Sequence, residues 1–273
     1  MTHVSDNGTR IWYEVTGDGP PLVLTGGWGL LDAQWHGVRP LLAKEFKCID
    51  WNTRGCGKSD RGWPGGFPLD RWVDDLAVVL DHLGYDGGEN KVHLWATSTG
   101  SMLAIRFAAR YPERVASLIT FPMFVVAPAS RQKAATYLAL AENFGYQALA
   151  RFTQWIGCAD QYVYGAKGDE IAKFEAGVFA ENFSIAAISK IMDAYYTCDL
   201  SADVAKLTMP VMLYMGSSGQ NGADKLKPAV DSFLDLCPSA ELKIMPNLGG
   251  TYLMVEEPET AAPPVIEWVK RHS

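Results

Sequence analysis

Ser98 is the residue whose surroundings most clearly favour chemistry. It lies at the centre of Ala96-Thr97-Ser98-Thr99-Gly100, a small-x-Ser-x-Gly pattern that directly follows the apolar run 92–96. This pattern is typical of a nucleophile elbow, in which a tight turn between a strand and a helix lifts the serine hydroxyl above the sheet. Small residues are needed there because the strand and the helix approach each other closely. The sequence therefore predicts that Ser98 acts as a nucleophile or as a hydrogen-bond donor.

A second candidate feature is the glycine-rich stretch Gly26-Gly27-Trp28-Gly29, which directly follows the apolar run 21–25. Glycines at the exit of a strand let backbone N–H groups point into a site, where they can stabilise an oxygen that becomes negatively charged during acyl transfer. We predict an oxyanion hole formed by the amides of Gly27, Trp28 and Thr99. The alternative is that this stretch forms a plain turn.

Alternating strands and helices must position these residues. An Asn7-Gly8 hairpin signal precedes a strand of alternating polarity. Strands are expected at 9–15, 21–25, 46–50, 92–96, 115–121, 210–216 and 242–246, and helices at 35–43, 69–83, after Ser98, at 229–236 and at 264–271. This order is typical of βαβ units, so we predict an α/β fold with a doubly wound, mostly parallel sheet.

Between residues 128 and 207 the strand pattern stops and segments with helical character dominate. We predict a helical cap at 128–207, inserted into a core made of 1–127 and 208–273. The cap is rich in aromatic residues, which suits an apolar pocket for a flat or bulky ligand. The predicted ligand contacts are Trp28, Thr97, Phe124, Tyr137, Phe152 and Trp155. For each aromatic ring the alternative is that it simply packs the interior of the cap.

Composition and charge argue against several classes of function. The formal net charge of the 273 residues is -7, whereas nucleic acids and anionic membranes require a basic face. The five cysteines are odd in number and lack CxxC or Cys/His spacing, so neither a disulfide framework nor a zinc site is expected. No Gly-x-Gly-x-x-Gly step follows the first strand. We expect no metal, flavin or nicotinamide cofactor.

The first residues show no basic region followed by an apolar run, and no stretch approaches the length of a membrane span. These features predict a cytoplasmic protein without a membrane partner. The expected partner is a hydrophobic small molecule, and a homodimer is left open.

With these features in place, the chain resembles the α/β-hydrolase superfamily over nearly its whole length. The matching stretches are Leu22 to Gly29, Asp50-x-x-x-Arg54-Gly55-x-Gly57-x-Ser59, the elbow at Ser98, Tyr111 to Val115, and Glu256 to Glu259. The second stretch lacks the Gly-x-x-x-x-Gly-Lys-Ser spacing of a nucleotide site. The resemblance implies a triad in which a histidine takes the serine proton and a carboxylate orients the histidine.

The triad implied by the resemblance is incomplete. Its histidine is expected in a Gly-His step before a Glu-x-Pro segment, but Gly250-Thr251-Tyr252 places Thr251 there. Threonine cannot act as a base near neutral pH. For the acid we favour Asp224, which is followed by Pro228, with a solvated loop aspartate as the alternative. Tyr252 and Asp224 are candidates for moving protons.

No other histidine is well placed to replace the missing base. His93 precedes Ser98 by an odd number of residues in the same strand, so its side chain is expected on the opposite face. His82 ends a covering helix, and His3 and His272 lie near the chain ends. His36, in the helix after the oxyanion loop, is the least unfavourable candidate, against the alternative of a surface or core histidine.

Three functions follow from an intact elbow pattern and oxyanion loop beside a missing base. The first is a non-hydrolytic enzyme that promotes cyclisation, condensation, rearrangement or another C–C bond step on an aromatic or polyketide-like molecule. The second is an ester, lactone or thioester hydrolase whose base comes from His36, the substrate or a water held by Asp224. The third is a ligand-binding pseudoenzyme that kept the pocket and lost the chemistry.

Overall fold

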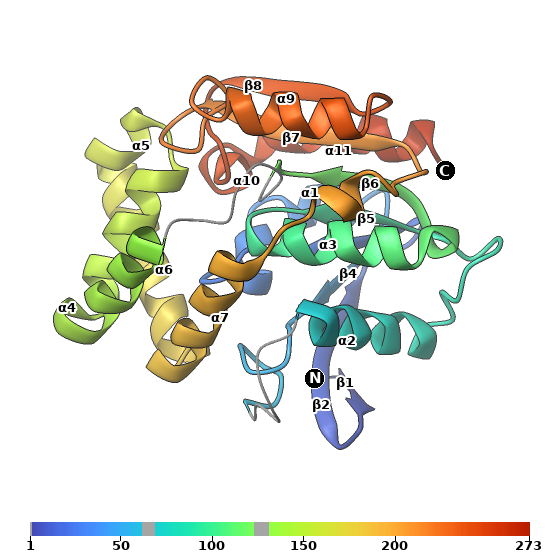
Figure 1. The fold of residues 1–273 in the computed structure, drawn as a ribbon, viewed down its shortest axis with the longest axis horizontal. Helices are drawn as coiled ribbons and strands as arrows, with labels where there is room; N and C mark the ends of the chain where they lie inside the picture. Colours follow the sequence, from blue (N-terminus) through green and yellow to red (C-terminus); the bar gives the residue numbers. More distant parts are fainter. Residues whose placement is uncertain (1, 62–68, 123–130) are drawn as a thin grey trace.

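The computed structural model describes residues 2–61, 69–122 and 131–273, without the side chains of 131–134 and 193–197. It contains one eight-stranded sheet with the order β1-β2-β4-β3-β5-β6-β7-β8 (Figure 1). The strands are β1 (Thr2–Asp6), β2 (Thr9–Thr16), β3 (Pro21–Thr25), β4 (Lys47–Trp51), β5 (Val92–Ala96), β6 (Val115–Thr120), β7 (Val211–Ser218) and β8 (Glu241–Gly249). The sheet confirms the predicted α/β fold.

The sheet is parallel from β4 to β8 and antiparallel at its N-terminal edge. Strands β1 and β2 form a hairpin whose turn residues Asn7 and Gly8 have φ angles of 48° and 84°. Such positive values suit a two-residue hairpin turn, as the Asn-Gly pair predicts. β2 then pairs antiparallel with β4, and the remaining pairs are parallel.

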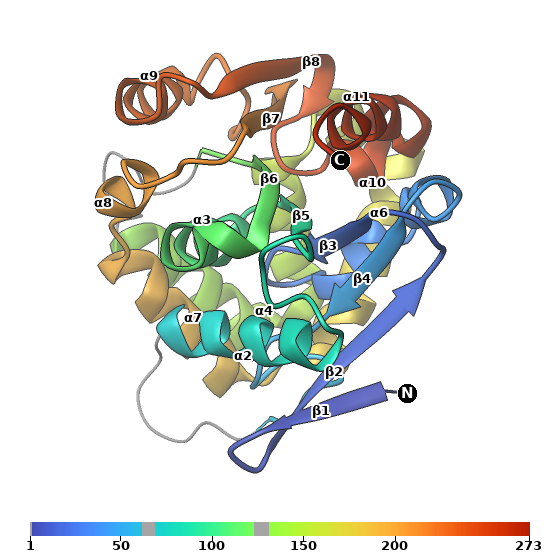
Figure 2. The ribbon, with the colours of Figure 1, turned by 90° about the vertical axis from the view of Figure 1, so that its right-hand side faces the viewer.

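Helices cover both faces of the sheet (Figure 2). On one face lie α2 (Leu69–His82) and α3 (Thr99–Arg110), in the same apolar cluster as Val23. The terminal helix α11 (Pro258–Arg271) packs on the other face, in the cluster that contains Leu22 and Leu24. Because successive side chains of β3 enter opposite clusters, Leu22, Val23 and Leu24 are all apolar and do not alternate with polar residues.

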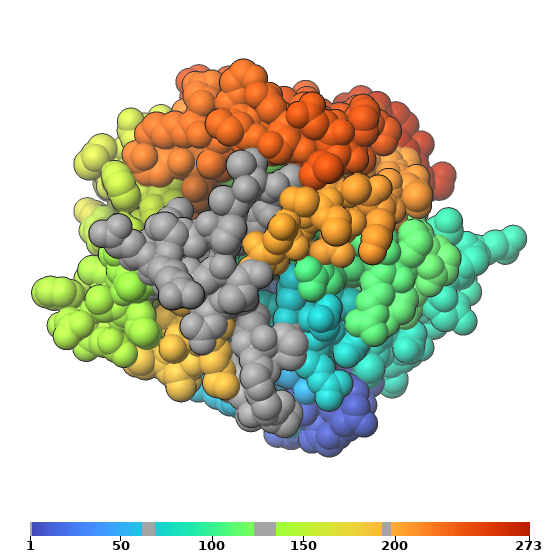
Figure 3. Space-filling view, viewed as in Figure 1, coloured from blue at the N-terminus to red at the C-terminus, as the bar shows by residue number. Residues whose placement is uncertain are grey.

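Helices make up most of the described chain between β6 and β7. They are α4 (Arg131–Gly157), α5 (Asp160–Tyr164), α6 (Ala166–Asn182), α7 (Ile185–Thr197) and α8 (Ser201–Val204). We call α4 to α7 the helical layer. It lies to the left of the sheet in Figure 1 and forms the left side of the surface in Figure 3. Its backbone is interrupted in α4 at Gly145, which has a φ of 77°.

Two predicted helices differ from the observed ones. The single helix expected at 35–43 is split into η1 (Leu31–Trp35) and α1 (Arg39–Leu42). The break lies at 36–38, where hydrogen bonds span three residues instead of four, from the His36 N–H to Ala33 O and from the Val38 N–H to Trp35 O, and where Pro40 has no N–H to donate to His36 O. The terminal helix begins at Pro258 rather than at Pro264, because a proline is well tolerated in the first turn of a helix.

Short elements and one further helix complete the described chain. They are η2 (Pro112–Arg114), α9 (Lys227–Leu236) and α10 (Leu253–Glu256).

All five cysteines are buried free thiols. No helix in the ranges 2–61, 69–122 and 131–273 is both long and apolar enough to cross a membrane.

Candidate active site

Ser98 occupies a sharp turn between β5 and α3. Its backbone angles are φ 52° and ψ −128°, a positive φ that non-glycine residues rarely adopt. The close approach explains the neighbouring glycine, because a Cβ on Gly100 would overlap the carbonyl oxygen of Thr25. A Cβ on Gly27 would likewise lie 2.8 Å from the Cβ of Ser98. The elbow and the glycine-rich loop therefore lie directly against each other.

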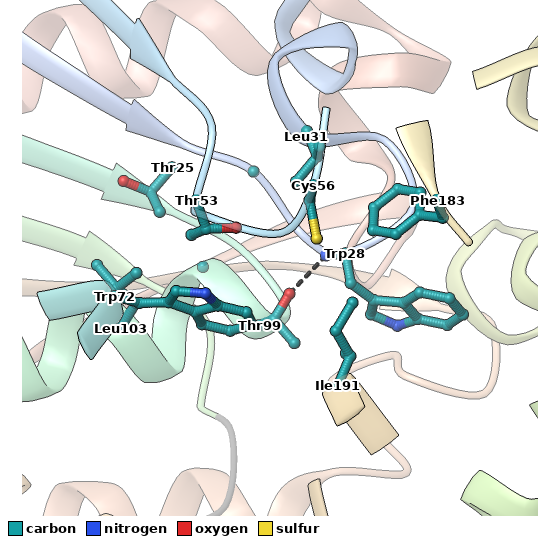
Figure 4. A pocket seen from close by; sticks show the side chains of 12 residues that line it. Thr25, Trp28, Leu31, Thr53, Cys56, Trp72, Thr99, Leu103, Phe183 and Ile191 are labelled. Atoms are coloured by element: carbon teal, nitrogen blue, oxygen red, sulfur yellow. Dashed lines mark hydrogen bonds between the residues drawn. The ribbon is translucent and has the colours of Figure 1, made fainter. Parts of the chain in front are cut away.

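Two amides of the predicted oxyanion hole donate to protein oxygens. The N–H of Gly27 donates to Gln34 Oε1 at 2.7 Å. The N–H of Trp28 donates to Thr99 Oγ1 at 2.5 Å (Figure 4). Thr99 is the first residue of α3, so its own N–H has no partner within the helix. Of the three predicted donors, the Thr99 N–H is therefore the one that the start of α3 leaves available beside Ser98.

Gln34 links the glycine-rich loop to the position where the superfamily pattern expects a histidine. Its side chain is buried, with 3% of its surface exposed. Its Nε2 donates to the carbonyl oxygen of Thr251 at 3.1 Å and contacts Met254 Sδ at 3.6 Å. Thr97 Oγ1 donates to the same carbonyl at 3.5 Å. The structure thus brings Thr97 and Thr251 together, and it adds Gln34, which no sequence motif had marked.

Thr251 and Tyr252 contact the end of α4. Both lie within 3 Å of the point that a Cβ on Gly157 would occupy. The Tyr252 hydroxyl donates to Glu175 Oε1 on α6. Burial raises the pKa of Glu175 to about 8 and also raises the pKa of Tyr252 well above its usual value. The Tyr252 hydroxyl is therefore hydrogen-bonded to a residue of the helical layer.

The structure does not bring the predicted acid into the site. Asp224 is exposed in the turn between β7 and α9. The loop that carries Asp224 is instead held by the backbone contact of Ala223 with Gly216.

All five histidines lie in the described ranges of the chain. His93 is buried: its Nδ1 lies 2.8 Å from Ser117 Oγ, and its Nε2 lies 3.2 Å from Ser273 Oγ. Burial lowers the pKa of His93 to about 4. His36 is exposed and its ring centroid is 6.0 Å from that of Phe174.

A small cavity adjoins the elbow (Figure 4). Its lining carries no charged side chain and combines aromatic and aliphatic groups with three threonines. The lining residues are Thr25, Gly26, Trp28, Leu31, Thr53, Cys56, Trp72, Thr99, Gly100, Leu103, Phe183 and Ile191. Sequence reasoning found Trp28 but missed Phe183 and Ile191, which reach the cavity from the helical layer.

The other predicted ligand contacts lie elsewhere. Tyr137 packs edge-on against Trp28 at 5.2 Å and against Phe152 at 5.1 Å, measured between ring centroids. Phe152 in turn stacks on Trp155, whose surface is 43% exposed. This row of rings joins the glycine-rich loop to the outside of the helical layer without lining the described cavity. Phe124 lies outside the described residues.

Side chains that could hold a metal do not gather in the described part of the chain. No group of three or more histidine, cysteine, aspartate or glutamate side chains is arranged there to bind an ion.

The proteins that the chain is similar to include some that are named as hydrolases. It is 34% identical over 104 residues to "Pimeloyl-[acyl-carrier protein] methyl ester esterase" of Aeromonas hydrophila, a match that covers only 38% of either chain. It is 24% identical over 254 residues to a protein provisionally named carbamate hydrolase RutD of Stutzerimonas stutzeri, covering 90% of this chain and 92% of that one.

Among solved structures, a thermophilic esterase from Thermogutta terrifontis superposes with a TM-score of 0.81 at 23% identity, and all of both chains is covered. This identity level shows the shared fold. The family model for the alpha/beta hydrolase fold matches residues 20–249. The chain therefore belongs to the α/β-hydrolase fold family.

Proposed function

We propose that this protein hydrolyses a small ester, lactone or thioester with an apolar acyl group, and that Ser98 is the nucleophile. The observation that carries the proposal is the left-handed backbone of Ser98 at the start of α3, pressed against Gly27. Such a conformation costs about 1–3 kcal/mol and is typical of functional sites. The esterase names of relatives support the same reaction class.

In this proposal Ser98 Oγ attacks the substrate carbonyl carbon and forms a tetrahedral intermediate. The N–H of Thr99, at the N-terminus of α3, donates to the resulting negative oxygen. Collapse of the intermediate breaks the bond to the leaving group, which takes up a proton, and leaves an acyl-serine. Water then attacks the acyl carbon, releasing the acid and restoring the Ser98 hydroxyl.

The route of the Ser98 proton sets the expected rate. Thr251 occupies the position where the family pattern has a histidine, and a threonine cannot take up the serine proton near neutral pH. We propose that the proton leaves through water or a basic group of the substrate. Because a positioned general base contributes about 10²–10⁴-fold, turnover should be slow relative to an enzyme with a complete triad.

The lining of the cavity beside the elbow supports the proposed substrate class. An uncharged lining that includes Trp72, Leu103 and Ile191 favours an apolar chain or ring. A charged acyl group would lose its hydration there without gaining a partner, which is strongly unfavourable. We also propose that the protein is cytoplasmic and that residues 128–207 form a helical cap.

A fluorophosphonate probe tests the nucleophile directly. Wild-type protein at neutral pH should be labelled, and peptide mapping should find the adduct on Ser98. Ser98→Ala should abolish the adduct and the hydrolysis of p-nitrophenyl butyrate. Thr97→Ala, which keeps the nucleophile, is the control. An unlabelled Ser98 in folded protein would rule the proposal out.

Thr251 at the position of the family's histidine favours a second candidate function. Because threonine does not take up the serine proton near neutral pH, the Thr99 N–H could polarise a substrate carbonyl without activation of the serine. A non-hydrolytic C–C bond step on an aromatic or polyketide-like molecule would suit such a site. Incubation in ¹⁸O-labelled water separates the two candidates, because only hydrolysis places the label in the acid product. Binding without any conversion would instead indicate a pseudoenzyme.

A further inference from the structure

We infer that Gln34 is a positioning residue that controls access to the N–H of Gly27. Its amide holds this donor until a ligand oxygen displaces it. The inference rests on the proposed function for its catalytic consequence, but the contact itself can be tested without turnover.

The first argument is the complete pairing of the buried amide. Gln34 Oε1 accepts from Gly27, while Nε2 donates to Thr251 and approaches Met254. The oxygen faces an N–H donor and the nitrogen faces a carbonyl, so the pattern defines a single orientation of the side-chain amide. Moving a buried amide that is hydrogen-bonded through both its oxygen and its nitrogen costs free energy unless other hydrogen bonds replace those that are lost.

The second argument is proximity to Ser98. Gln34 Oε1 and Ser98 Oγ lie 3.4 Å and 3.3 Å from the point that a Cβ on Gly27 would occupy. The Gly27 N–H therefore belongs to the immediate surroundings of the serine hydroxyl. A substrate oxygen that used this donor would compete with Gln34 Oε1 for it.

The third argument is that the adjacent amide is held in a similar way. Trp28 donates to Thr99 Oγ1, so the glycine-rich loop is fixed at two successive N–H groups. Gln34 differs from Thr99 because it also reaches the loop after β8. A ligand oxygen that binds the Gly27 N–H would displace Gln34 Oε1. Because Gln34 Nε2 is bonded to the Thr251 carbonyl, this displacement would also change the position of Thr251.

Gln34→Met tests the inference, because methionine has a similar length but no strong hydrogen-bond acceptor. Gln154→Met is the matched control: Gln154 is also fully buried, and its Nε2 donates to the carbonyls of Tyr162 and Gly168 within the helical layer. The readouts are amide hydrogen exchange of ¹⁵N-labelled Gly27 and its shift on titration with phenylacetate, a carboxylate with an apolar ring.

In Gln34→Met, Gly27 exchange should accelerate and phenylacetate should bind about three- to tenfold more tightly, the equivalent of one hydrogen bond. Gln154→Met should leave both unchanged. Gln34→Glu, which keeps an acceptor oxygen, should keep Gly27 protected and weaken phenylacetate binding through charge repulsion. This variant provides the test if Gln34→Met does not fold.

Unchanged Gly27 exchange in Gln34→Met, or equal phenylacetate affinity in the two proteins, would overturn the inference. Failure of the proposed function is a separate result: Ser98 would then resist the fluorophosphonate probe in every variant while the Gly27 responses remain as expected.

Discussion

The Tyr252 hydroxyl donates to Glu175, and this contact joins the loop after β8 to helix α6. Glu175 is 1% exposed, and its Oε2 has no hydrogen-bond partner among the described residues. Burial disfavours the ionised carboxylate and raises the pKa of Glu175 to about 8 from a usual value of 4.5. The junction of the helical layer with the core should therefore depend on pH.

The stabilising effect of protonated Glu175 should be complete below pH 4.5 and lost as the pH rises towards 8. The reason is that the folded state binds this proton in a range where the unfolded state releases it. Relative to wild type, Glu175→Gln should become more stable across this window, by an amount on the order of a few kcal/mol. Urea unfolding at several pH values measures the difference. Glu170→Gln, an exposed change on the same helix, controls for lost charge.

Gly157→Ala should destabilise the same junction. The added methyl group would overlap the Tyr252 ring, and overpacking of this kind costs about 1–3 kcal/mol. Gly177→Ala is the control, since a Cβ there meets nothing within 4 Å and alanine favours the helix. Thermal unfolding should show a lower midpoint only for the first variant. Equal midpoints would mean that α4 can shift away from the loop.

Ser98→Gly should be more stable than Ser98→Ala by about 1 kcal/mol, because glycine tolerates a φ of 52° and alanine does not. Both variants lack the hydroxyl, so the difference between their free energies of unfolding reports the cost of the positive φ angle at position 98. Urea unfolding gives the values, and both proteins should resist the fluorophosphonate probe. A more stable alanine variant would show that the elbow relaxes when the side chain is lost.

Thr251→His alone should not create an active triad. Thr251 is 4% exposed and its Oγ1 lies close to the space above Gly157, so an imidazole should cost about 1–3 kcal/mol through overpacking. The exposed Asp224 would not orient it. Esterase assays from pH 5 to 9, with Thr251→Ser as control, should show no gain in rate. A rate that rises with an apparent pKa near 6.5 would contradict this prediction.

Ile191→Val should lengthen the acyl chain that the protein accepts. Ile191 lines the cavity, and removal of one methyl group makes room for about one carbon at a stability cost of about 0.5–1.5 kcal/mol. The kcat/KM values for p-nitrophenyl esters from acetate to octanoate measure the change. Ile188→Val, equally buried on α7 but outside the lining, should lose similar stability without a change of preference. A common shift in both variants would locate the acyl group elsewhere.

The sequence by itself determined the sheet, the hairpin and the elbow. These features depend on neighbours in the chain: the strands need short apolar runs, the Asn7-Gly8 turn needs positive φ angles, and Ser98 needs Gly100 beside it. The prediction of one helix at 35–43 was wrong because the chain forms three-residue hydrogen bonds there, which the apolar pattern does not distinguish from those of a regular helix.

Only the tertiary structure decided which side chains surround Ser98. Gln34 and Thr251 are 217 positions apart, and their hydrogen bond depends on the lengths of all the loops between them. The solvent exposure of Asp224 and the inward placement of Phe183 are decided in the same way. Spacing along the chain identifies the residue types that could do chemistry, but the packing of remote elements determines which of them come into contact.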